Sequence, residues 1–293
     1  MKRWLVLDVS YLAHRAFHVM GHLEYQGIKT GIIYQFLKTI GQLKDEFQTD
    51  RIAFCFEHPH LFRRDVFPDY KKHRSTRLKT DEEKRAYSTL QNQIQDLHKK
   101  HLPRIGFRNI FCIDGHESDD LMAALAKNVS PYDEMILVTA DSDMYQVLAP
   151  NVMIYSPQKQ KLLTCEWFVK KYRIFPRQWA VVKAICGCAS DEVPGIPGIG
   201  EITALSYLQG YVKEGTRAYT SINSREGKTI VRRNRALVQL PYQGCSVPAL
   251  VEDKLNVDGW KEVCKTLGMK SLAGHPPIAT RKLGSGLFSF CVA

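Results

Sequence analysis

Short apolar runs, each followed by an acidic residue, recur through the first half of the chain. The runs cover residues 4–7, 52–56, 110–113 and 135–138, and the acids that follow them are Asp8, Glu57, Asp114 and Asp141. Near-continuous apolar runs of this length are typical of strands buried on both faces of a parallel sheet. The pattern therefore predicts an α/β fold with a mostly parallel central sheet flanked by helices.

Between these runs, apolar residues recur at spacings of three and four. Ile32, Ile33, Phe36, Leu37, Ile40 and Leu43 follow this spacing. They predict an amphipathic helix over 31–47. The ranges 82–102 and 118–129 show the same period. Alternating strands and helices of this kind are expected to form one domain over residues 1–175.

The pattern changes after about residue 175. Residues 181–185 and 202–208 predict short helices, with a Gly/Pro-dense stretch before the second of them. A basic stretch follows, with Arg225, Lys228, Arg232, Arg233 and Arg235. We expect a helical second domain over 176–272 and a loosely ordered tail over 273–293.

The overall charge narrows the choice of partners. Lys and Arg number 41 against 30 Asp and Glu, a formal net charge of +11. Such a balance favours a polyanion, and nucleic acid over lipid where no amphipathic anchor is evident. No apolar run approaches the roughly 20 residues of a membrane span. The eight cysteines lack the paired spacing of zinc fingers, so we expect reduced thiols in a cytoplasmic protein.

Acidic residues gather where the predicted strands end. Asp8, Glu57, Glu117, Asp119, Asp120, Asp141 and Asp143 all lie at or just beyond these ends. In an open parallel sheet the carboxyl ends line one ligand-binding edge, where seven anions would repel one another unless cations were present. Mg²⁺ or Mn²⁺ fits such oxygen ligands and can act on a phosphodiester. Taken singly, each acid could instead be a turn residue or a helix N-cap.

A basic segment leaves the sheet near these acids. Residues 70–79 include Tyr70, Lys71, Lys72, Arg74, Arg77 and Lys79. Such a run is often only a solvated face. Its position near the acids favours a segment that covers the site and neutralises the charge of a scissile phosphate. Tyr70 is expected either to stack on a terminal base or to anchor the segment by packing.

The Gly/Pro stretch at 193–200 is a candidate for backbone recognition. Gly195, Gly198 and Gly200 would let backbone N–H groups approach a phosphate just before a helix. A plain turn is the ordinary interpretation. Because a basic stretch follows it, we favour a sequence-independent grip on DNA, with Arg232 and Arg233 as further contacts.

Several motifs together resemble the 5′-nuclease superfamily. They are residues 8–18, 67–74, 117–120 and 139–143, and Ser190-Asp191 followed by 193–200. The superfamily includes flap endonucleases, the 5′-nuclease domain of bacterial DNA polymerase I and stand-alone phage 5′-exonucleases, which the chain most resembles in length. The resemblance implies a PIN-like nuclease domain, a helical arch near residues 70–100, and a helix–three-turn–helix element that binds duplex DNA and often holds K⁺.

The resemblance also implies two metal clusters. Asp8, Glu57, Glu117, Asp119, Asp120 and Asp141 match the first, Asp143 and Asp191 match the second, and Lys71, Lys72 and Arg74 match the cations at the base of the arch. The family pattern has Asp where Glu57 and Cys188 stand and Asn where Glu192 stands. A thiol is a weak ligand for Mg²⁺. Cys188 is therefore expected to weaken the second site, with Glu192 partly compensating.

These features predict a 5′-3′ exonuclease or flap endonuclease that depends on Mg²⁺ or Mn²⁺. It would hydrolyse DNA at 5′ ends, flaps or nicks, with replication proteins as candidate partners. Two alternatives stay open. One is a DNA fork- or nick-binding protein of the same fold whose catalysis has decayed at Cys188. The other is a PIN-type ribonuclease, which the Gly/Pro loop and its basic helix disfavour.

Overall fold

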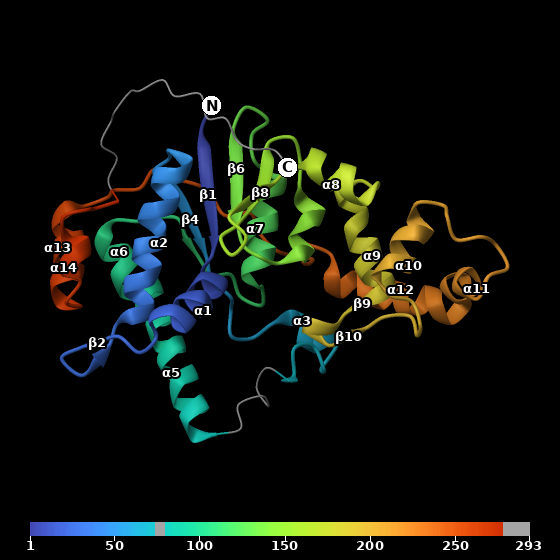
Figure 1. Ribbon diagram of the computed structural model, residues 1–293, viewed down its shortest axis with the longest axis horizontal. Helices are drawn as coiled ribbons and strands as arrows, with labels where there is room; N and C mark the ends of the chain where they lie inside the picture. The colour runs from blue at the N-terminus through green and yellow to red at the C-terminus, as the bar shows by residue number, and fades with distance from the viewer. Residues whose placement is uncertain (74–79, 278–293) are drawn as a thin grey trace.

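A computed structural model describes residues 1–73 and 80–277. At its centre is a six-stranded sheet in the order β5-β4-β1-β6-β7-β8 (Figure 1). The strands are β1 (Arg3–Asp8), β4 (Arg51–Cys55), β5 (Ile110–Phe111), β6 (Glu134–Val138), β7 (Val152–Ser156) and β8 (Lys161–Leu163). Neighbours are parallel except β7 and β8, which are antiparallel. The predicted α/β class with a mostly parallel sheet is confirmed.

Alternation along β1 divides the interior into two cores. Leu5 and Leu7 belong to one buried cluster, and Trp4 and Val6 belong to the other. Successive side chains of a strand point to opposite faces, so both faces of the sheet must be covered. This explains the continuous apolar run that identified the strand in the sequence.

Helices supply the cover on each face. One face carries α1 (Val9–Met20), α2 (Gly31–Phe47), the π-helical turn η1 (Leu97–His101) and α6 (Leu102–Ile105), and the other carries α7 (Ser118–Lys127), α8 (Cys165–Tyr172) and α9 (Trp179–Cys186). The helix predicted over 31–47 is confirmed as α2. Its buried side chains follow the predicted spacing.

The basic second half packs against α9. It contains α10 (Glu201–Leu208), α11 (Arg217–Asn223) and α12 (Arg225–Val238), with α12 lying along α9 (Figure 1). Trp179, Ile196 and Ile222 belong to the same buried cluster as Leu121 of α7. The apolar core therefore continues across residue 175. The division into two domains at that point stays a prediction.

The chain then returns to the first half. Residues 251–256 run beside residues 105–109, just before β5. α13 (Val257–Thr266) packs on α6, and α14 (Lys270–Ala273) follows it (Figure 1). The backbone N–H of Lys254 donates to the Gly106 carbonyl at 2.9 Å, and that of Asn256 donates to Ile105 at 2.8 Å. Gly106 has φ of +99°, and a Cβ there would meet the Lys254 carbonyl oxygen at 1.9 Å. Only glycine allows this close approach.

The segment expected to form an arch is described on both sides of a gap. Residues 70–73 precede it, and α5 (Asp81–Asp96) follows it, extending away from the sheet (Figure 1). A capping box between Thr80 and Glu83 begins α5. Arg74, Arg77, Lys79 and the tail from residue 278 lie outside the described residues.

Two further expectations concern the whole chain. Within the described ranges, no helix has the length and apolar character needed to cross a membrane. The cysteines of those ranges are all free thiols, in agreement with the prediction. A cytoplasmic location stays a prediction.

Candidate active site

Four carboxylates from different elements meet at the carboxyl edge of the sheet. We call Asp8, Glu117, Asp119 and Asp141 the first cluster. Asp8 ends β1, Asp141 follows β6, and Glu117 and Asp119 lie at the start of α7. Glu117, Asp119 and Asp141 line one cleft. Asp8 adjoins it through Ser118, whose hydroxyl donates to Asp8 Oδ1 at 3.2 Å. The predicted convergence of strand-end acids is found for these four and for Asp143, which lines the same cleft.

Asp8 is a helix cap as well as a member of the cluster. Its Oδ1 accepts from the backbone N–H of Tyr11 at 3.1 Å, as an N-cap of α1 does. The hydroxyl of Thr139 donates to Oδ2 at 3.4 Å. Burial nevertheless raises the pKa of Asp8. The N-cap alternative and the metal-ligand prediction are therefore compatible for this residue.

Asp119 and Asp141 are the carboxylates whose charge is least compensated. Burial and the charges of Asp141 and Asp8 raise the pKa of Asp119 well above its usual value. Its Oδ1 is buried and has no hydrogen-bond partner within the described ranges. Asp141 is open to solvent on one side. The surrounding protein and the charge of Asp143 still raise its pKa to about 6. A bound cation would relieve this repulsion.

Glu117 differs from these two because cations surround it. Its Oε1 accepts from Lys71 Nζ, and its Oε2 accepts from the Tyr70 hydroxyl at 2.8 Å and lies 3.0 Å from Arg63 Nη1. Burial alone would raise the pKa of Glu117, but the charges of Lys71 and Arg63 outweigh it and lower the pKa. Glu117 is therefore held as a carboxylate.

Asp120 faces away from its neighbour Asp119. Its two oxygens accept from Arg63 Nη1 and Nη2 at 2.5 and 2.8 Å, and from the backbone N–H groups of Glu117 and Tyr242 at 3.0 and 2.7 Å. Consecutive helical residues point about 100° apart. The structure thus places Asp120 in a buried ion pair with Arg63, apart from the other acids predicted for the first cluster.

The described part of the basic segment, residues 70–73, contributes one cation to the cleft. Lys71 is 6% exposed and lies between Glu117 and Asp191, its Nζ 3.7 Å from Asp191 Oδ1. Lys72 is exposed and pairs with Asp69 at 3.0 Å. Tyr70 is 3% exposed, so packing favours the anchor alternative for it over base stacking. Glu57 follows β4 but does not line the cleft.

A second cluster lies on loops beside the first. It consists of Asp143 in η2 (Ser142–Val147), Cys188 in β9 (Gly187–Cys188), and Asp191 in η4 (Ala189–Asp191). Their donor atoms lie within 4.8 Å of one another, and within the described ranges no other group of three metal-ligating side chains, the first cluster included, brings its donor atoms this close together. Burial and the charges of both aspartates raise the pKa of Cys188 to about 12. The thiol is therefore protonated in the absence of a metal ion.

Glu192 does not join this cluster. Both of its carboxylate oxygens accept from the backbone N–H of His73, at 3.1 and 2.9 Å, and Oε1 lies 3.0 Å from His73 Nε2. The backbone N–H of Lys71 donates to the Asp191 carbonyl at 3.1 Å. Glu192 thus ties the base of the arch to the loop of the second cluster. The expectation that it compensates for Cys188 as a ligand is not supported by this position.

The Gly/Pro loop separates into packing and exposed positions. A Cβ at Gly195 would meet the Cys186 backbone at 2.2 Å, so this glycine permits close packing against α9. Gly198, with φ of +77°, and Gly200 face open space. Arg232 is exposed on α12, whereas Arg233 donates to the Pro194 carbonyl at 3.0 Å. Gly198, Gly200 and Arg232 are the positions that a DNA backbone could reach.

Sequence reasoning missed two buried cations. Arg63 in α3 (Phe62–Val66) is 1% exposed and holds Glu117 and Asp120. Nothing in its neighbourhood in the sequence marks it. Lys183 lies 3.1 Å from Asp143 Oδ1 and 3.8 Å from Glu201. The single charge within the apolar stretch Trp179–Cys186 was an available signal for it.

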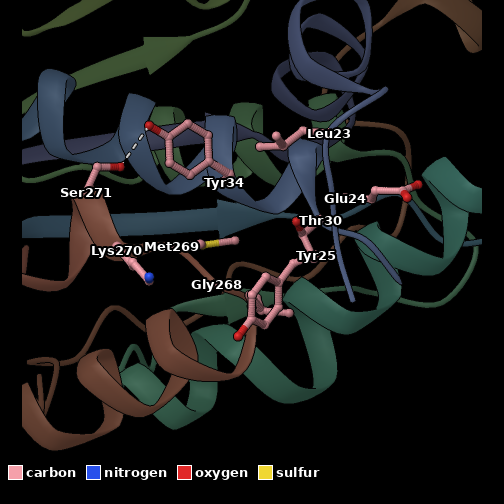
Figure 2. Close-up of a pocket in the computed structure, with 10 residues that line it drawn as sticks. Leu23, Glu24, Tyr25, Thr30, Tyr34, Gly268, Met269, Lys270 and Ser271 are labelled. Carbon is pink, nitrogen blue, oxygen red and sulfur yellow. Dashed lines mark hydrogen bonds between the residues drawn. The ribbon is translucent and has the colours of Figure 1, made fainter. Parts of the chain in front are cut away.

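Another surface pocket shares no residue with the two clusters. It measures about 370 Å³ and lies between residues 23–34 and 267–271 (Figure 2). Figure 2 shows the Tyr34 hydroxyl beside Ser271, at 3.1 Å. The acids that could hold metal ions therefore lie outside this pocket.

Comparison with known proteins decides the family. Residues 3–173 match the family model described as "5'-3' exonuclease, N-terminal resolvase-like domain". The chain belongs to this family. The resemblance to 5′-nucleases is thereby confirmed.

Relatives and solved structures agree with this membership. The thermostable DNA polymerase I of Thermus thermophilus is 32% identical over 71% of this chain, which spans only 24% of that protein. The 5'-3' exonuclease of Buchnera aphidicola is 28% identical over 80% of the chain and 79% of its own length. The T5 5'-exonuclease with bound zinc shares the fold, with a TM-score of 0.71 at 20% identity, covering 94% of this chain and 100% of that one.

Proposed function

We propose that this protein is a divalent-metal-dependent 5′-nuclease that hydrolyses phosphodiester bonds at 5′ ends, flaps or nicks of DNA. The observation that carries the proposal is the first cluster, where burial raises the pKa values of Asp8, Asp119 and Asp141, and where the charges of neighbouring aspartates add to the rise at Asp119 and Asp141. An anionic cleft in a chain of net charge +11 suits metal ions at a phosphate, with basic surfaces for the rest of a polymer.

The first cluster is the proposed site of the principal ion, Mg²⁺ or Mn²⁺. Asp8, Asp119 and Asp141 offer the oxygens, and the buried Oδ1 of Asp119, which has no hydrogen-bond partner in the described ranges, is suited to coordinate a cation. When bound, such an ion lowers the pKa of an attacking water and neutralises charge on the phosphate. Glu117 and Asp120 are assigned instead to positioning Lys71 and Arg63, because their oxygens already contact these cations.

Lys71 is the proposed protein cation for the reacting phosphate. It is buried between the two clusters and lines the cleft. A fixed ammonium group at this place can stabilise charge that develops on phosphate oxygens. Lys72 and Arg74 share this role only as a family expectation, since Lys72 points to Asp69 and Arg74 lies outside the described ranges.

The exposed part of the Gly/Pro loop and α12 are proposed to bind the backbone of duplex DNA. Gly198 and Gly200 lead into the N-terminus of α10, where backbone N–H groups favour an anion. Arg232, with Arg77, Lys79 and Arg233 as further expected contacts, would add sequence-independent charge. A K⁺ ion at this loop rests on the family resemblance alone.

The loop can be tested with a matched pair of substitutions. Gly200→Asp and Gly200→Asn introduce side chains of nearly equal size, both suited to an N-cap. The charge in Gly200→Asp should weaken binding to a nicked duplex by about fivefold, since a charge at a helix end contributes about 1 kcal/mol. Gly200→Asn should bind like the parent. Equal affinities in a fluorescence titration would exclude the loop from the interface.

The function itself is tested with labelled substrates. The purified protein would be incubated with a 5′-labelled flap, a nicked duplex and a single-stranded RNA, in Mg²⁺, Mn²⁺ or EDTA. We expect metal-dependent release of short 5′ products from DNA. Tight DNA binding without cleavage in either metal would favour the decayed binding protein. Cleavage confined to RNA would favour the ribonuclease.

A further inference from the structure

The second cluster differs from the first in its donor atoms. Cys188 stands between two aspartates, and its Sγ is 3.6 Å from Asp143 Oδ2 and 3.4 Å from Asp191 Oδ2. The residue is 6% exposed. One sulfur and two carboxylate oxygens therefore face one another in a pocket of three elements, a set that Mg²⁺ does not favour.

The spacing matches a different class of ion. A tetrahedral Zn²⁺ with a Zn–S bond near 2.3 Å and Zn–O bonds near 2.1 Å separates sulfur and oxygen ligands by about 3.6 Å. The two S···O separations of the site, 3.4 and 3.6 Å, lie within 0.2 Å of this value. An octahedral ion with the same bond lengths would place adjacent sulfur and oxygen ligands only about 3.1 Å apart.

The surroundings orient the carboxylates toward the sulfur. Asp143 directs Oδ1 to Lys183 Nζ at 3.1 Å, and Asp191 directs Oδ1 toward Lys71 Nζ at 3.7 Å. In both residues Oδ2 is the atom that faces Cys188. Such outer contacts fix the orientation of metal ligands and tune the ion they hold.

We propose that Asp143, Cys188 and Asp191 form a thiolate-containing site selective for a borderline-soft divalent cation of the Zn²⁺ class over Mg²⁺. The inference deepens the proposed function by naming the ion of its second site. Binding replaces the S–H bond of Cys188 with a sulfur–metal bond, and the proton leaves to solvent. The two carboxylates bind as anions, and the remaining coordination position is left for water or a phosphate oxygen.

Cobalt is the probe that tests this site without any nuclease assay. Co²⁺ adopts Zn²⁺-like coordination, and a thiolate ligand gives it a charge-transfer absorption band in the near ultraviolet. The full chain would be titrated with Co²⁺ in a non-thiol reductant. We expect one band that saturates, that Zn²⁺ removes, and that a large excess of Mg²⁺ leaves in place.

Substitutions at two neighbouring cysteines assign the band. Cys188→Ser should remove it and weaken Zn²⁺ binding by about 100-fold in a chelator competition, the range expected for damage to a metal site. Cys186→Ser is the matched control, since Cys186 lies two residues away and outside the cluster, and it should keep the band. Cys188→Asp should lose the band and bind Mn²⁺ more tightly than the parent. Circular dichroism would verify the folding of each variant.

The outcomes separate this inference from the proposed function. A missing band, or a band unchanged in Cys188→Ser or lost in Cys186→Ser, overturns the thiolate site whatever the DNA assay shows. A parent that binds Co²⁺ as expected but cleaves no DNA in Mg²⁺, Mn²⁺ or Zn²⁺ keeps the metal site and overturns the nuclease.

Discussion

The two clusters differ in how the negative charges of their carboxylates are compensated. In the first, Asp8, Asp119 and Asp141 crowd together on a strand end, a helix and a strand-end turn, and their pKa values rise. In the second, each aspartate faces a lysine, and the third member is a neutral thiol. The first cluster thus depends on a bound cation for its charge balance, whereas the second is largely balanced by the protein itself.

The secondary-structure elements that hold the two clusters also differ. Asp8 and Asp119 are held by β1 and α7, whose surroundings are buried on both faces of the sheet. Asp143 and Asp191 are on short 3₁₀ helices of six and three residues. Rigid elements hold ligands more accurately than loops do. This contrast leads us to expect that chemistry is more sensitive to the first cluster than to the second.

The largest effect is expected for Asp119→Asn. A metal ligand contributes several kcal/mol to the transition state, so cleavage should fall by roughly 1,000-fold or more. DNA binding should stay equal or tighten, since one charge that repels phosphate is gone. Single-turnover cleavage and a binding titration in Ca²⁺ would measure both.

Asp114→Asn is the matched control for Asp119→Asn. Asp114 also follows a strand of the sheet, but its side chain is 94% exposed. Its substitution should leave cleavage within twofold of the parent. Similar losses in the two variants would remove the distinction on which the first cluster rests.

Arg63→Met tests the buried ion pairs that Arg63 forms with Glu117 and Asp120. It leaves the buried Asp120 and the Oε2 of Glu117 without their cation. Breaking a buried ion pair in this way costs about 3–5 kcal/mol of unfolding free energy, which urea denaturation would measure. Arg63→Met combined with Asp120→Leu should recover part of the loss. No recovery would mean that charge alone does not explain the effect, since Asp120→Leu also removes the acceptor of the Glu117 and Tyr242 N–H groups.

Lys71→Met tests the cation that links the clusters. Turnover should fall by roughly 100-fold, with a smaller change in affinity, because a fixed charge acts mainly on the transition state. Lys72→Met, the exposed neighbour, should stay within twofold. A loss in Lys71→Met that disappears at saturating DNA would identify a binding residue.

The smallest expected effect is on the pH dependence of the stability of the metal-free protein. The pKa of Asp141 is raised to about 6 from an ordinary value of 3.8, so the folded protein binds this proton more tightly than the unfolded chain does. Its contribution to stability in EDTA should therefore fall as pH rises from about 4 to 6. Asp141→Asn should melt at a higher temperature than the parent at pH 8 in EDTA. Adding Mg²⁺ should narrow this difference, and a lower melting temperature for the variant would contradict the sign.

Local patterns in the sequence predicted much of the sheet and its helices. Strand positions at 4–7 and 135–138 were clear because their apolar residues form continuous runs, as in strands buried on both faces of a sheet. The helix over 31–47 was clear because its buried positions repeat at three- and four-residue spacing. β7 and β8 were not predicted. The return of α13 to α6 was also missed, because it depends on contacts more than 140 residues apart in sequence, such as Asn109 with Val251.

The sequence located the acidic residues of the site, but it did not show which role each of them has. Adjacent residues Asp119 and Asp120 look alike in sequence, yet one joins the cluster and the other pairs with Arg63. Helical geometry separates them, but only the position of Arg63 shows which one is neutralised. Arg63 becomes visible as a buried cation only when its partner Asp120, distant in the sequence, is in place, whereas Lys183 is marked in the sequence as the single charge of an apolar stretch.

The segment beside β5 also bears on solubility. Asn109, just before β5, exchanges two hydrogen bonds of 2.8 Å with the backbone of Val251, and residues 254 and 256 bond the turn at 105–106. An exposed sheet edge is a template for pairing with another molecule. Because the segment lies against residues 105–109 at this margin, we expect it to limit self-association through the sheet edge. A chain shortened before residue 250 would expose both the margin and the apolar partners of Trp260, and it should aggregate even though every acid of both clusters is retained.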